Sequence, residues 1–592
     1  MKRRLGAAAA AAALALLCAG EARAQEKYAL AMFHFNVQYV AGGMVGYWAV
    51  PNPEVDIEAP VIEDLIITES LEPVIDLFEK HPSWGVDIEM QGYMLDVMAA
   101  RHPALLDKMR VMAKSGQIDV VSFHYSDQIF IAYPQEDWER SQALTAETFK
   151  KHDVPLSRSV FCQEGQAGMA LAPAMKERGY RTLVWPKNLW GYQHGDFEAQ
   201  PIYKLGDVFM VAGSKDVVYQ KDGVDIAVTW SFLDDGELLA TGELNPYFPD
   251  VFRHKPEEVA KYEAELLGLE AQGYSITTVD KYVEAVTAAN VPLADPPPLL
   301  DGTWQPKSTD GVLRWLGGRG LWGQNERDND VRTLGAITHR ELVAAETIAK
   351  EAGIDAAAAL GSAWRLMFLG QVSDATGINP FRGEVEYGIG HFTEALRIAR
   401  DVITEAKAAM GSESVSIDPE AGTATSGEAQ EEAVMPIDPP LALVIDAGDR
   451  QSSQAWEELG PGRRRVTITV GPGEGTLVTA TFPGSGPDFI TTRALADATP
   501  VSYSRADFVF EHFYLALPTG VISLNPNLFV IKDQARAHVA AKITPDNGDV
   551  TFVDDTVPAL ESMEWVFYLF EGTADEAVKE ARALNVKRRL SR

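Results

Sequence analysis

The region from Tyr28 to about Val291 alternates short β-forming runs with stretches of helical character. Such alternation predicts a parallel sheet whose strands are joined by crossover helices. Eight runs have strand character, at 28–35, 86–90, 118–123, 159–162, 182–185, 208–211, 226–232 and 275–278. Seven or eight strands fit a (β/α)7-type barrel, which we expect here. An open doubly wound sheet also fits, but no Gly-x-Gly-x-x-Gly follows the first strand, so a dinucleotide site has no support.

The 592 residues are too many for one hydrophobic core, and roughly 150 residues per domain suggest three or four compact units. A Pro-rich break at 295–298 separates the α/β region from later segments with helical spacing, and then from alternating runs typical of a β-sandwich. The predicted units are a signal peptide (1–24), a catalytic barrel (25–295), a Gly/Trp-rich connection (296–330), a helical domain (331–410), a flexible acidic linker (411–439) and a β-sandwich (440–592).

The N-terminus has the pattern of an export signal. Lys2, Arg3 and Arg4 precede an apolar run at 5–19, and Ala22-Arg23-Ala24 supplies small residues for cleavage before Gln25. We therefore expect a periplasmic or secreted protein. No later stretch reaches the roughly 18–20 continuous apolar residues of a membrane span. Cleavage leaves a single cysteine, so no intramolecular disulfide is expected.

The overall charge narrows the choice of partners. Acidic residues outnumber basic ones 85 to 52, and the formal net charge is -33. Such a molecule repels phosphate backbones, so nucleic acid is not an expected partner. Hydrophobic residues at 46% and charged residues at 23% are typical of a folded globular chain rather than a disordered one.

Polar residues at the carboxyl ends of the predicted strands are the candidates for function, because the loops of a parallel barrel meet at that edge. The candidates are His34, Asn36, His124, Asp127, Glu164, Asp234 and Asp235. Two carboxylates on separate strand ends suit glycosidic cleavage, in which one attacks the anomeric carbon and the other protonates the leaving oxygen. Glu164 with Asp234 or Asp235 is the predicted pair. Trp185 and Trp190, just beyond the fifth strand, are predicted to offer flat faces for sugar rings.

Five short motifs occur in an order that resembles glycoside hydrolase family 57, particularly its 4-α-glucanotransferases and α-amylases. The family's His-x-His is similar to His34-Phe35-Asn36, and its Gly-Gln-(Val/Ile)-Glu to residues 116–119. Its Trp-x-x-Glu nucleophile segment resembles residues 161–164, with Phe161 in place of the tryptophan. The Asp-Asp-Gly-Glu run is matched at 234–237, and Gln-x-(Asn/Ser)-Asp at 371–374.

The resemblance implies a retaining enzyme that acts on an α-linked glucan or oligosaccharide without a cofactor, and the N-terminal signal pattern adds that it is exported. Glu164 would be the nucleophile, and Asp234 or Asp235 the acid/base; we favour Asp234, which is nearer the strand end. Asp374 would lie on a loop that reaches over the barrel mouth. His34, Asn36, His124, Asp127, Phe161, Trp185, Trp190 and Asp374 complete the predicted substrate-binding set.

Three alternatives stay open. Asn36 and Phe161 replace family residues, which favours a non-catalytic glycan-binding or envelope scaffold protein as the main rival. A polysaccharide deacetylase-like metal enzyme would need His34, His124 and Asp127 around its ion. Family 38 α-mannosidases hold zinc through His-x-Asp and a nucleophilic Asp, but Asn36 and Glu164 stand in those places here. We therefore predict no metal.

Overall fold

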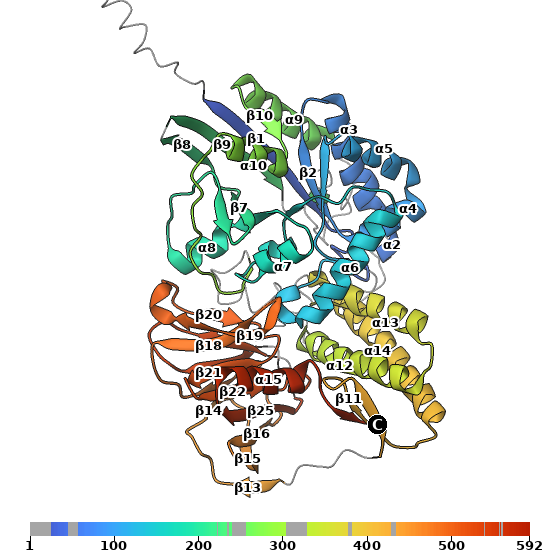
Figure 1. Ribbon diagram of the computed structural model, residues 1–592, viewed down its shortest axis with the longest axis vertical. Helices are drawn as coiled ribbons and strands as arrows, with labels where there is room; N and C mark the ends of the chain where they lie inside the picture. The colour runs from blue at the N-terminus through green and yellow to red at the C-terminus, as the bar shows by residue number, and fades with distance from the viewer. Residues whose placement is uncertain are drawn as a thin grey trace, which may run out of the picture.

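The computed structural model describes residues 25–44, 57–221, 223–233, 236–238, 256–303, 328–376, 382–427, 434–537, 539–555, 557 and 560–592. In Figure 1 the α/β region lies at the top in blue to green, the long helices α12–α14 lie in yellow, and a β-rich region lies below in orange and red. The chain is therefore a mixed α/β protein with a β-rich C-terminal region.

The first sheet is built around β1 (Glu26–Phe35), and its strand order is β3-β2-β1-β9-β8. β1 is almost wholly buried from Ala29 onward, as expected for a central strand covered on both faces. It runs parallel to β9 along most of its length and parallel to β2 and β10 over shorter stretches. The other strands are β2 (Val86–Met90), β3 (Ile118–Val121), β8 (Val217–Lys221), β9 (Val224–Leu233) and β10 (Ser275–Thr277).

A second sheet has the order β4-β5-β7-β6. Its strands are β4 (Ser159–Val160), β5 (Thr182–Pro186), β6 (Tyr203–Leu205) and β7 (Val208–Gly213). All eight predicted strands are therefore present. Among the described residues, however, no ladder joins β3 to β4, so the expected barrel is not closed by hydrogen bonds. β4 is only two residues long, and the antiparallel neighbours β6 and β8 occupy positions at the sheet edges.

Helices connect and cover these strands, and Figure 1 shows α3, α4 and α5 beside β2. The long helix α6 has acidic residues in its first turn and lysines in its last, which complements the helix dipole. The described helices of this region are α2 (Ala59–Leu65), α3 (Glu72–Lys80), α4 (Gly92–Arg101), α5 (Pro103–Lys114), α6 (Gln135–Lys151), α7 (Leu171–Glu177), α8 (Lys187–His194), α9 (Pro256–Ala271) and α10 (Val279–Ala288).

Three helices follow where the sequence predicts a helical domain: α12 (Asp328–Ala352), α13 (Ala357–Gly370) and α14 (Arg382–Met410). The stretch at 411–439, expected as a flexible acidic linker, differs from that expectation. It carries β11 (Val415–Asp418), β12 (Thr423–Ser426) and β13 (Met435–Ile437). Val415 and Ile417 are fully buried, and β11 pairs with β26 (Leu590–Ser591) at the end of the chain. Two alternating apolar residues thus order a segment whose composition is otherwise that of a linker.

The C-terminal region contains an eight-stranded and a five-stranded sheet among the described residues, with antiparallel pairing in both. The eight-stranded sheet has the order β13-β15-β16-β25-β22-β21-β18-β19, and the five-stranded sheet β14-β17-β24-β23-β20. Helix α15 (Ala574–Asn585) begins with a capping box in which Thr573 and Glu576 bond each other's backbone amides. The strands are β14 (Val444–Asp446), β15 (Ser452–Gly460), β16 (Arg463–Val470), β17 (Val478–Phe482), β18 (Asp488–Arg493), β19 (Ala496–Ser504), β20 (Phe513–Leu515), β21 (Val521–Asn525), β22 (Leu528–Lys532), β23 (Ala540–Ile543), β24 (Val550–Asp554) and β25 (Met563–Glu571).

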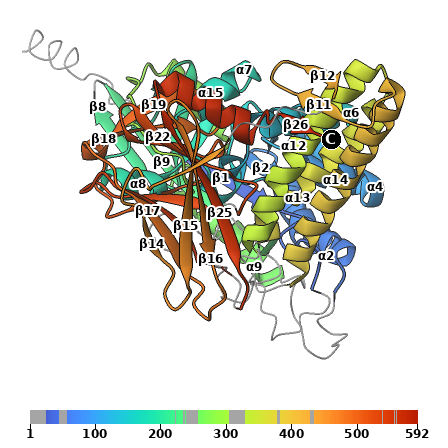
Figure 2. The ribbon, with the colours of Figure 1, turned by 90° about the horizontal axis from the view of Figure 1, so that it is seen from below.

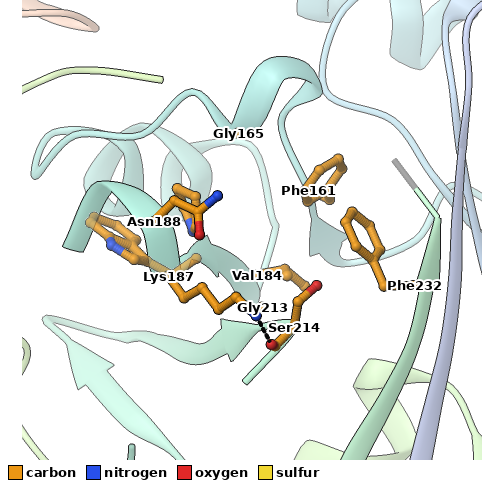
Figure 3. Close-up of a pocket in the computed structure, with 10 residues that line it drawn as sticks. Phe161, Gly165, Val184, Lys187, Asn188, Gly213, Ser214 and Phe232 are labelled. Atoms are coloured by element: carbon orange, nitrogen blue, oxygen red, sulfur yellow. Dashed lines mark hydrogen bonds between the residues drawn. The ribbon is translucent and has the colours of Figure 1, made fainter. Parts of the chain in front are cut away.

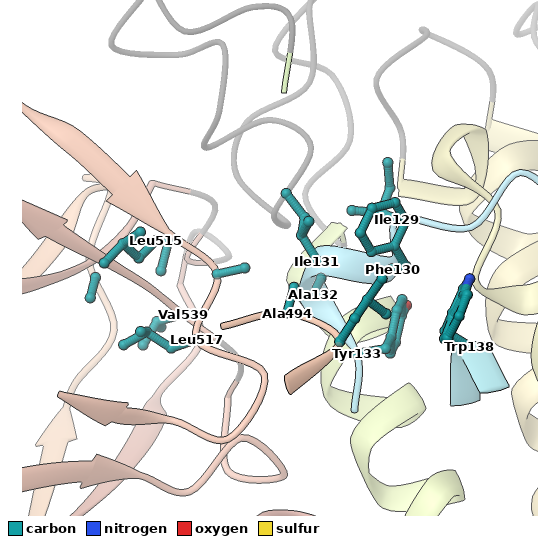
Figure 4. Close-up of a cluster of buried hydrophobic side chains, with 14 of the residues drawn as sticks. Ile129, Phe130, Ile131, Ala132, Tyr133, Trp138, Ala494, Leu515, Leu517 and Val539 are labelled. Carbon is teal, nitrogen blue, oxygen red and sulfur yellow. The ribbon is translucent and has the colours of Figure 1, made fainter. Parts of the chain in front are cut away.

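One continuous cluster of buried side chains joins the three regions. It includes Tyr133 from the α/β region, Phe392 from α14 and Leu515 from β20. Figure 4 shows Tyr133 and Trp138 near the helical region, with Leu515 and Leu517 on the β-rich side of the same cluster. Figure 2, seen from below, shows α12–α14 standing next to the C-terminal strands. Such shared burial favours a fixed arrangement of the regions.

None of the helices in the described part of the chain combines the length and the apolar character that a membrane crossing requires.

Candidate functional site

The carboxyl ends of β1 and β2 bring a histidine and a glutamate face to face. His34 and Glu89 are partners in the parallel register of these strands, and His34 Nδ1 is hydrogen-bonded to Glu89 Oε2. Asp127, which follows β3, lies with Oδ2 3.8 Å from His34 Nε2. All three side chains are buried. Three neighbouring strands thus place one imidazole between two carboxylates.

Burial and mutual charge decide the protonation of this cluster. Burial alone lowers the pKa of His34, but the carboxylates of Glu89 and Asp127 outweigh it and raise that pKa well above its ordinary value. Burial raises the pKa of Glu89, and it raises the pKa of Asp127 well above the usual range, in both cases against the opposing effect of His34. The group therefore holds protons more tightly than exposed side chains would.

His124 lies next to this cluster, with Nδ1 3.7 Å from Asp127 Oδ1. Burial, followed by repulsion from His34, lowers the pKa of His124 to about 3, so the ring is neutral near pH 7. The predicted residues His34, His124 and Asp127 are thus brought together.

Amide side chains connect the cluster to the helical region. Gln91, just after β2, donates through Nε2 to Asp127 Oδ2 and to Asn36 Oδ1, the latter at 2.5 Å. Asn36 Nδ2 in turn donates to Asp374 Oδ2 at 2.8 Å. The backbone N–H of Ser373 donates to the carbonyl oxygen of Asp127 at 2.8 Å. The loop with Asp374 therefore contacts the strand ends directly.

Glu164 follows β4 in a short turn, Gln163–Gly165, and has φ 57° and ψ 21°. This left-handed conformation is uncommon for residues other than glycine, and such strain concentrates at functional sites. Gln163 Nε2 donates to Glu164 Oε1 at 2.9 Å and to Ser373 Oγ at 2.5 Å. Ser373 Oγ donates to Asp374 Oδ2 at 3.0 Å. Hydrogen bonds thus run from Glu164 through Asp374 and Asn36 to Asp127.

Gly165, the residue after Glu164, is part of the lining of a pocket, whereas Glu164 itself is not (Figure 3). Phe161 and Phe232 contribute aromatic surface, and Lys187 and Asn188 contribute polar groups. Trp185 also borders the pocket but is 0% exposed, which corrects the expectation that it offers a flat face to a sugar ring. The rings of Phe161 and Phe232 meet edge to face, with centroids 5.2 Å apart. An aromatic wall with a few polar groups is typical of a site for a small organic ligand.

Trp190 is not part of this lining. It lies on α8, is 4% exposed, and stacks on Phe197 with ring centroids 4.3 Å apart. Its face is therefore used in packing, which corrects the expectation that Trp190 offers a sugar-binding surface. The expectation that residues beyond a strand end face the cleft fails for Trp190, because helix α8 begins directly after β5.

Asp234 and Asp235 lie outside the described residues. The described residues on either side are Leu233, which pairs in register with Phe33 of β1, and Gly236, which lies against the carbonyl oxygen of His34. Glu237 is buried and accepts a hydrogen bond from the backbone N–H of Asn36 at 3.3 Å.

Three polar residues of the cluster were missed in the sequence: Glu89, Gln91 and Glu237. The rule that selected His34 applies equally to Glu89 and Gln91, since both stand at the carboxyl end of a predicted strand. The sequence signal for Glu89 was an acidic residue near the end of the mostly apolar run 86–90.

The fold is similar to that of known glycosyl hydrolases. An α-mannosidase from Enterococcus faecalis superposes with a TM-score of 0.59 at 9% identity, covering 96% of this chain and 90% of that chain. A family 57 branching enzyme from Pyrococcus horikoshii superposes with a TM-score of 0.42 at 10% identity, covering 65% of this chain and 94% of that one. At these identities the similarity concerns the fold.

Part of the sequence is similar to a curated protein. Alpha-amylase 1 of Dictyoglomus thermophilum is 32% identical over 68 residues, which is 12% of this chain. The match spans 10% of the length of that amylase. No protein-family model matches the chain.

The residues do not fit the zinc site that family 38 enzymes build with His-x-Asp. Asn36 stands at the second position, and its Oδ1 already accepts from the backbone N–H of Gln38 at 2.7 Å and from Gln91 Nε2 at 2.5 Å. An amide oxygen has two lone pairs, so both are engaged.

Proposed function

We propose that this protein is an exported retaining glycoside hydrolase or glucanotransferase that acts on α-linked glucans, with Glu164 as the nucleophile. The observation that carries the proposal is the position of Glu164: a strained residue at a strand end, directly before Gly165 of the aromatic pocket in sequence and hydrogen-bonded into a buried polar network. A carboxylate fixed in this way suits attack on a sugar ring seated against the pocket.

In the proposed reaction Glu164 attacks the anomeric carbon while Asp234 or Asp235 protonates the departing oxygen. The same acid then removes a proton from water, which gives hydrolysis, or from an acceptor sugar, which gives transfer. Each step inverts the anomeric centre, so the product retains the configuration of the substrate. Retention requires the two carboxyl groups to lie roughly 5–5.5 Å apart.

The choice of α-glucan rests on the amylase similarity and on the order of the five motifs. The aromatic lining of Phe161 and Phe232 is compatible with the apolar face of a pyranose ring. The α-mannosidase similarity makes mannosides the necessary comparison substrates.

A second function is favoured by the substitution at Asn36. A protein that binds glycans or supports the cell envelope would keep the pocket and its polar network without turnover. Asn36 retains hydrogen-bonding capacity but lacks a titratable ring, which is compatible with binding alone.

The test compares the wild type with Glu164→Gln on maltooligosaccharides, glycogen and mannosides. Glu177→Gln is the matched control, because Glu177 is an exposed acid at the end of the next helix, α7. We expect cleavage or transfer by the wild type and the control, loss of at least about a thousandfold in Glu164→Gln, and a first product of retained anomeric configuration by NMR.

Equal activity of wild type and Glu164→Gln would remove Glu164 from the role of nucleophile. Binding of a glycan by both proteins without turnover would support the scaffold function.

Export is part of the proposal and is supported by the basic and apolar pattern of residues 1–24. Expression of the full chain in a bacterial host, followed by mass measurement of the periplasmic protein, should give a chain that begins at Gln25. A protein of full mass that stays in the cytoplasm would contradict export.

A further inference from the structure

We propose that His34, Glu89 and Asp127 form a binding site for a divalent transition-metal cation, with Zn²⁺ as the ion to test. The three side chains offer ligand atoms that all lie within 4.8 Å of one another. The proposal does not depend on the proposed glycosidase function, because it concerns binding that is measured without a glycan.

The backbone fixes the positions of these ligands. His34 and Glu89 are register partners on β1 and β2, and Glu89 is in turn a register partner of Val121 on β3, which Asp127 follows. The ladder between β1 and β2 therefore holds His34 beside Glu89. Asp127 lies in the buried segment after β3, where Gln91 Nε2 donates to its Oδ2 and the backbone N–H of Ser373 donates to its carbonyl oxygen. Ligands held by such supporting contacts bind metals with little ordering cost.

Buried oxygen atoms around the cluster lack partners. Glu89 and Asp127 are both 0% exposed, and Glu89 Oε1 and Asp127 Oδ1 have no hydrogen-bond partner among the described residues. The same holds for Oε1 of Gln91, whose amide nitrogen donates to Asp127. An inaccessible carboxylate oxygen without a donor is costly, and a bound cation removes that cost.

The charges point the same way. Two carboxylates face one imidazole, so the trio is acidic even when the imidazole is protonated. A bound divalent cation would offset this buried negative charge.

The ligand types and spacing fit zinc or a similar ion. One imidazole with carboxylates suits Zn²⁺, Mn²⁺ and Co²⁺. Two ligand atoms, each about 2.0–2.1 Å from a tetrahedral zinc, lie about 3.4 Å apart. The separation of 3.8 Å between His34 Nε2 and Asp127 Oδ2 needs an adjustment of only a few tenths of an ångström. Glu89 is hydrogen-bonded to Nδ1 on the other side of the ring, where it would orient the imidazole toward the ion. The proposed site of His34, Glu89 and Asp127 differs from the His-x-Asp zinc site of family 38 enzymes, in which the residue at position 36 would be a ligand.

The experiment uses the mature full-length protein, stripped with a chelator and then titrated with ZnCl₂ by calorimetry, with metal content checked by mass spectrometry. The variants are Asp127→Asn and Glu89→Gln. The matched control is His81→Gln, which removes a histidine that also bonds a carboxylate, Glu263, at 2.7 Å but outside the site.

We expect one zinc per chain in the wild type and in His81→Gln, and affinity weakened roughly tenfold or more in both site variants. Zinc should raise the melting temperature of the wild type and fail to do so for Asp127→Asn. Co²⁺ bound to the stripped wild type should show visible absorption bands that Asp127→Asn lacks. These bands test the site in the folded wild type even if a variant folds poorly.

Absence of stoichiometric zinc from the stripped wild type would overturn the proposal. Equal affinity in wild type and both site variants would also overturn it, because the ion would then bind elsewhere. Neither outcome bears on glycan turnover, which the Glu164→Gln comparison tests separately.

Discussion

Asn36 Nδ2 donates a hydrogen bond of 2.8 Å to Asp374 Oδ2, a residue that lies 338 positions later in the chain. The bond joins the end of the central strand β1 to the loop between α13 and α14. It is buried at both ends, so it contributes more than an exposed contact would. The amide at position 36 therefore contributes to holding the helical region against the strand ends, together with the bond from Ser373 N–H to the carbonyl oxygen of Asp127.

Asn36→Asp tests this dependence without changing the size of the side chain. The new carboxylate has no N–H to donate and meets the carboxylate of Asp374, so we expect a loss of roughly 1–3 kcal/mol in unfolding free energy. Asn547→Asp is the control, because Asn547 is on the surface and its Oδ1 only accepts hydrogen bonds. Urea unfolding of the three proteins gives the measurement, and an unchanged midpoint for Asn36→Asp would contradict the prediction.

Phe161 is expected to act through binding of the substrate rather than through the chemical step. Its ring lines the pocket and packs against Phe232. Phe161→Ala should raise KM roughly threefold to tenfold, the equivalent of one aromatic contact, with a smaller change in kcat. Phe197→Ala removes an aromatic ring that stacks on Trp190 away from the pocket and should leave KM unchanged. A fall in kcat alone for Phe161→Ala would assign the residue a different role.

Gly236 has no room for a side chain. A Cβ there would lie 2.4 Å from the carbonyl oxygen of His34, so Gly236→Ala must shift the segment that follows β9. This segment carries the predicted acid/base, and misplacement by about 1 Å costs up to about a hundredfold in rate. We expect kcat/KM to fall at least about tenfold. Gly191→Ala is the control, since a Cβ there meets no atom within 4 Å. Equal activity of both variants would contradict the prediction.

The sequence predicted the strands of the α/β region well because each is a short apolar run between turn signals. The partners β6 and β8 were not predicted, since hairpin strands at sheet edges lack that continuous apolar character. The strand β11 was hidden for a related reason: Val415 and Ile417, which are fully buried, are two apolar residues in a segment of mostly polar composition.

The candidate site was predictable only in part. His34, Asn36, His124 and Asp127 follow from the strand-end rule, and their proximity agrees with it. Asp374 was found through a motif resemblance, because no local pattern links residues so far apart in the chain. The left-handed conformation of Glu164 has no sequence signal at all, since it is imposed by the surrounding contacts.

Asp301 gives the chain a dependence of stability on pH. Its Oδ2 accepts from the backbone N–H of Ala494 at 2.7 Å, whereas its Oδ1 is inaccessible and has no partner among the described residues. Burial raises the pKa of this carboxyl to about 7, against the opposing hydrogen bond from Ala494 and the charge of Arg493. Between the ordinary pKa near 3.9 and about 7, the folded state binds more protons than the unfolded state. The contribution of Asp301 to stability is therefore greatest at low pH and is lost as the pH rises to about 7.

Asp301→Asn removes this titration while keeping an oxygen that accepts from Ala494. The variant should gain stability relative to the wild type as the pH rises from about 4 to 7, and the difference should be constant above that range. Urea unfolding at closely spaced pH values measures the difference directly. Asp546→Asn is the control, because Asp546 is an exposed carboxylate of the same β-rich region. A difference between Asp301→Asn and wild type that stays constant from pH 4 to 7 would mean that Asp301 is already ionised in the folded protein at low pH.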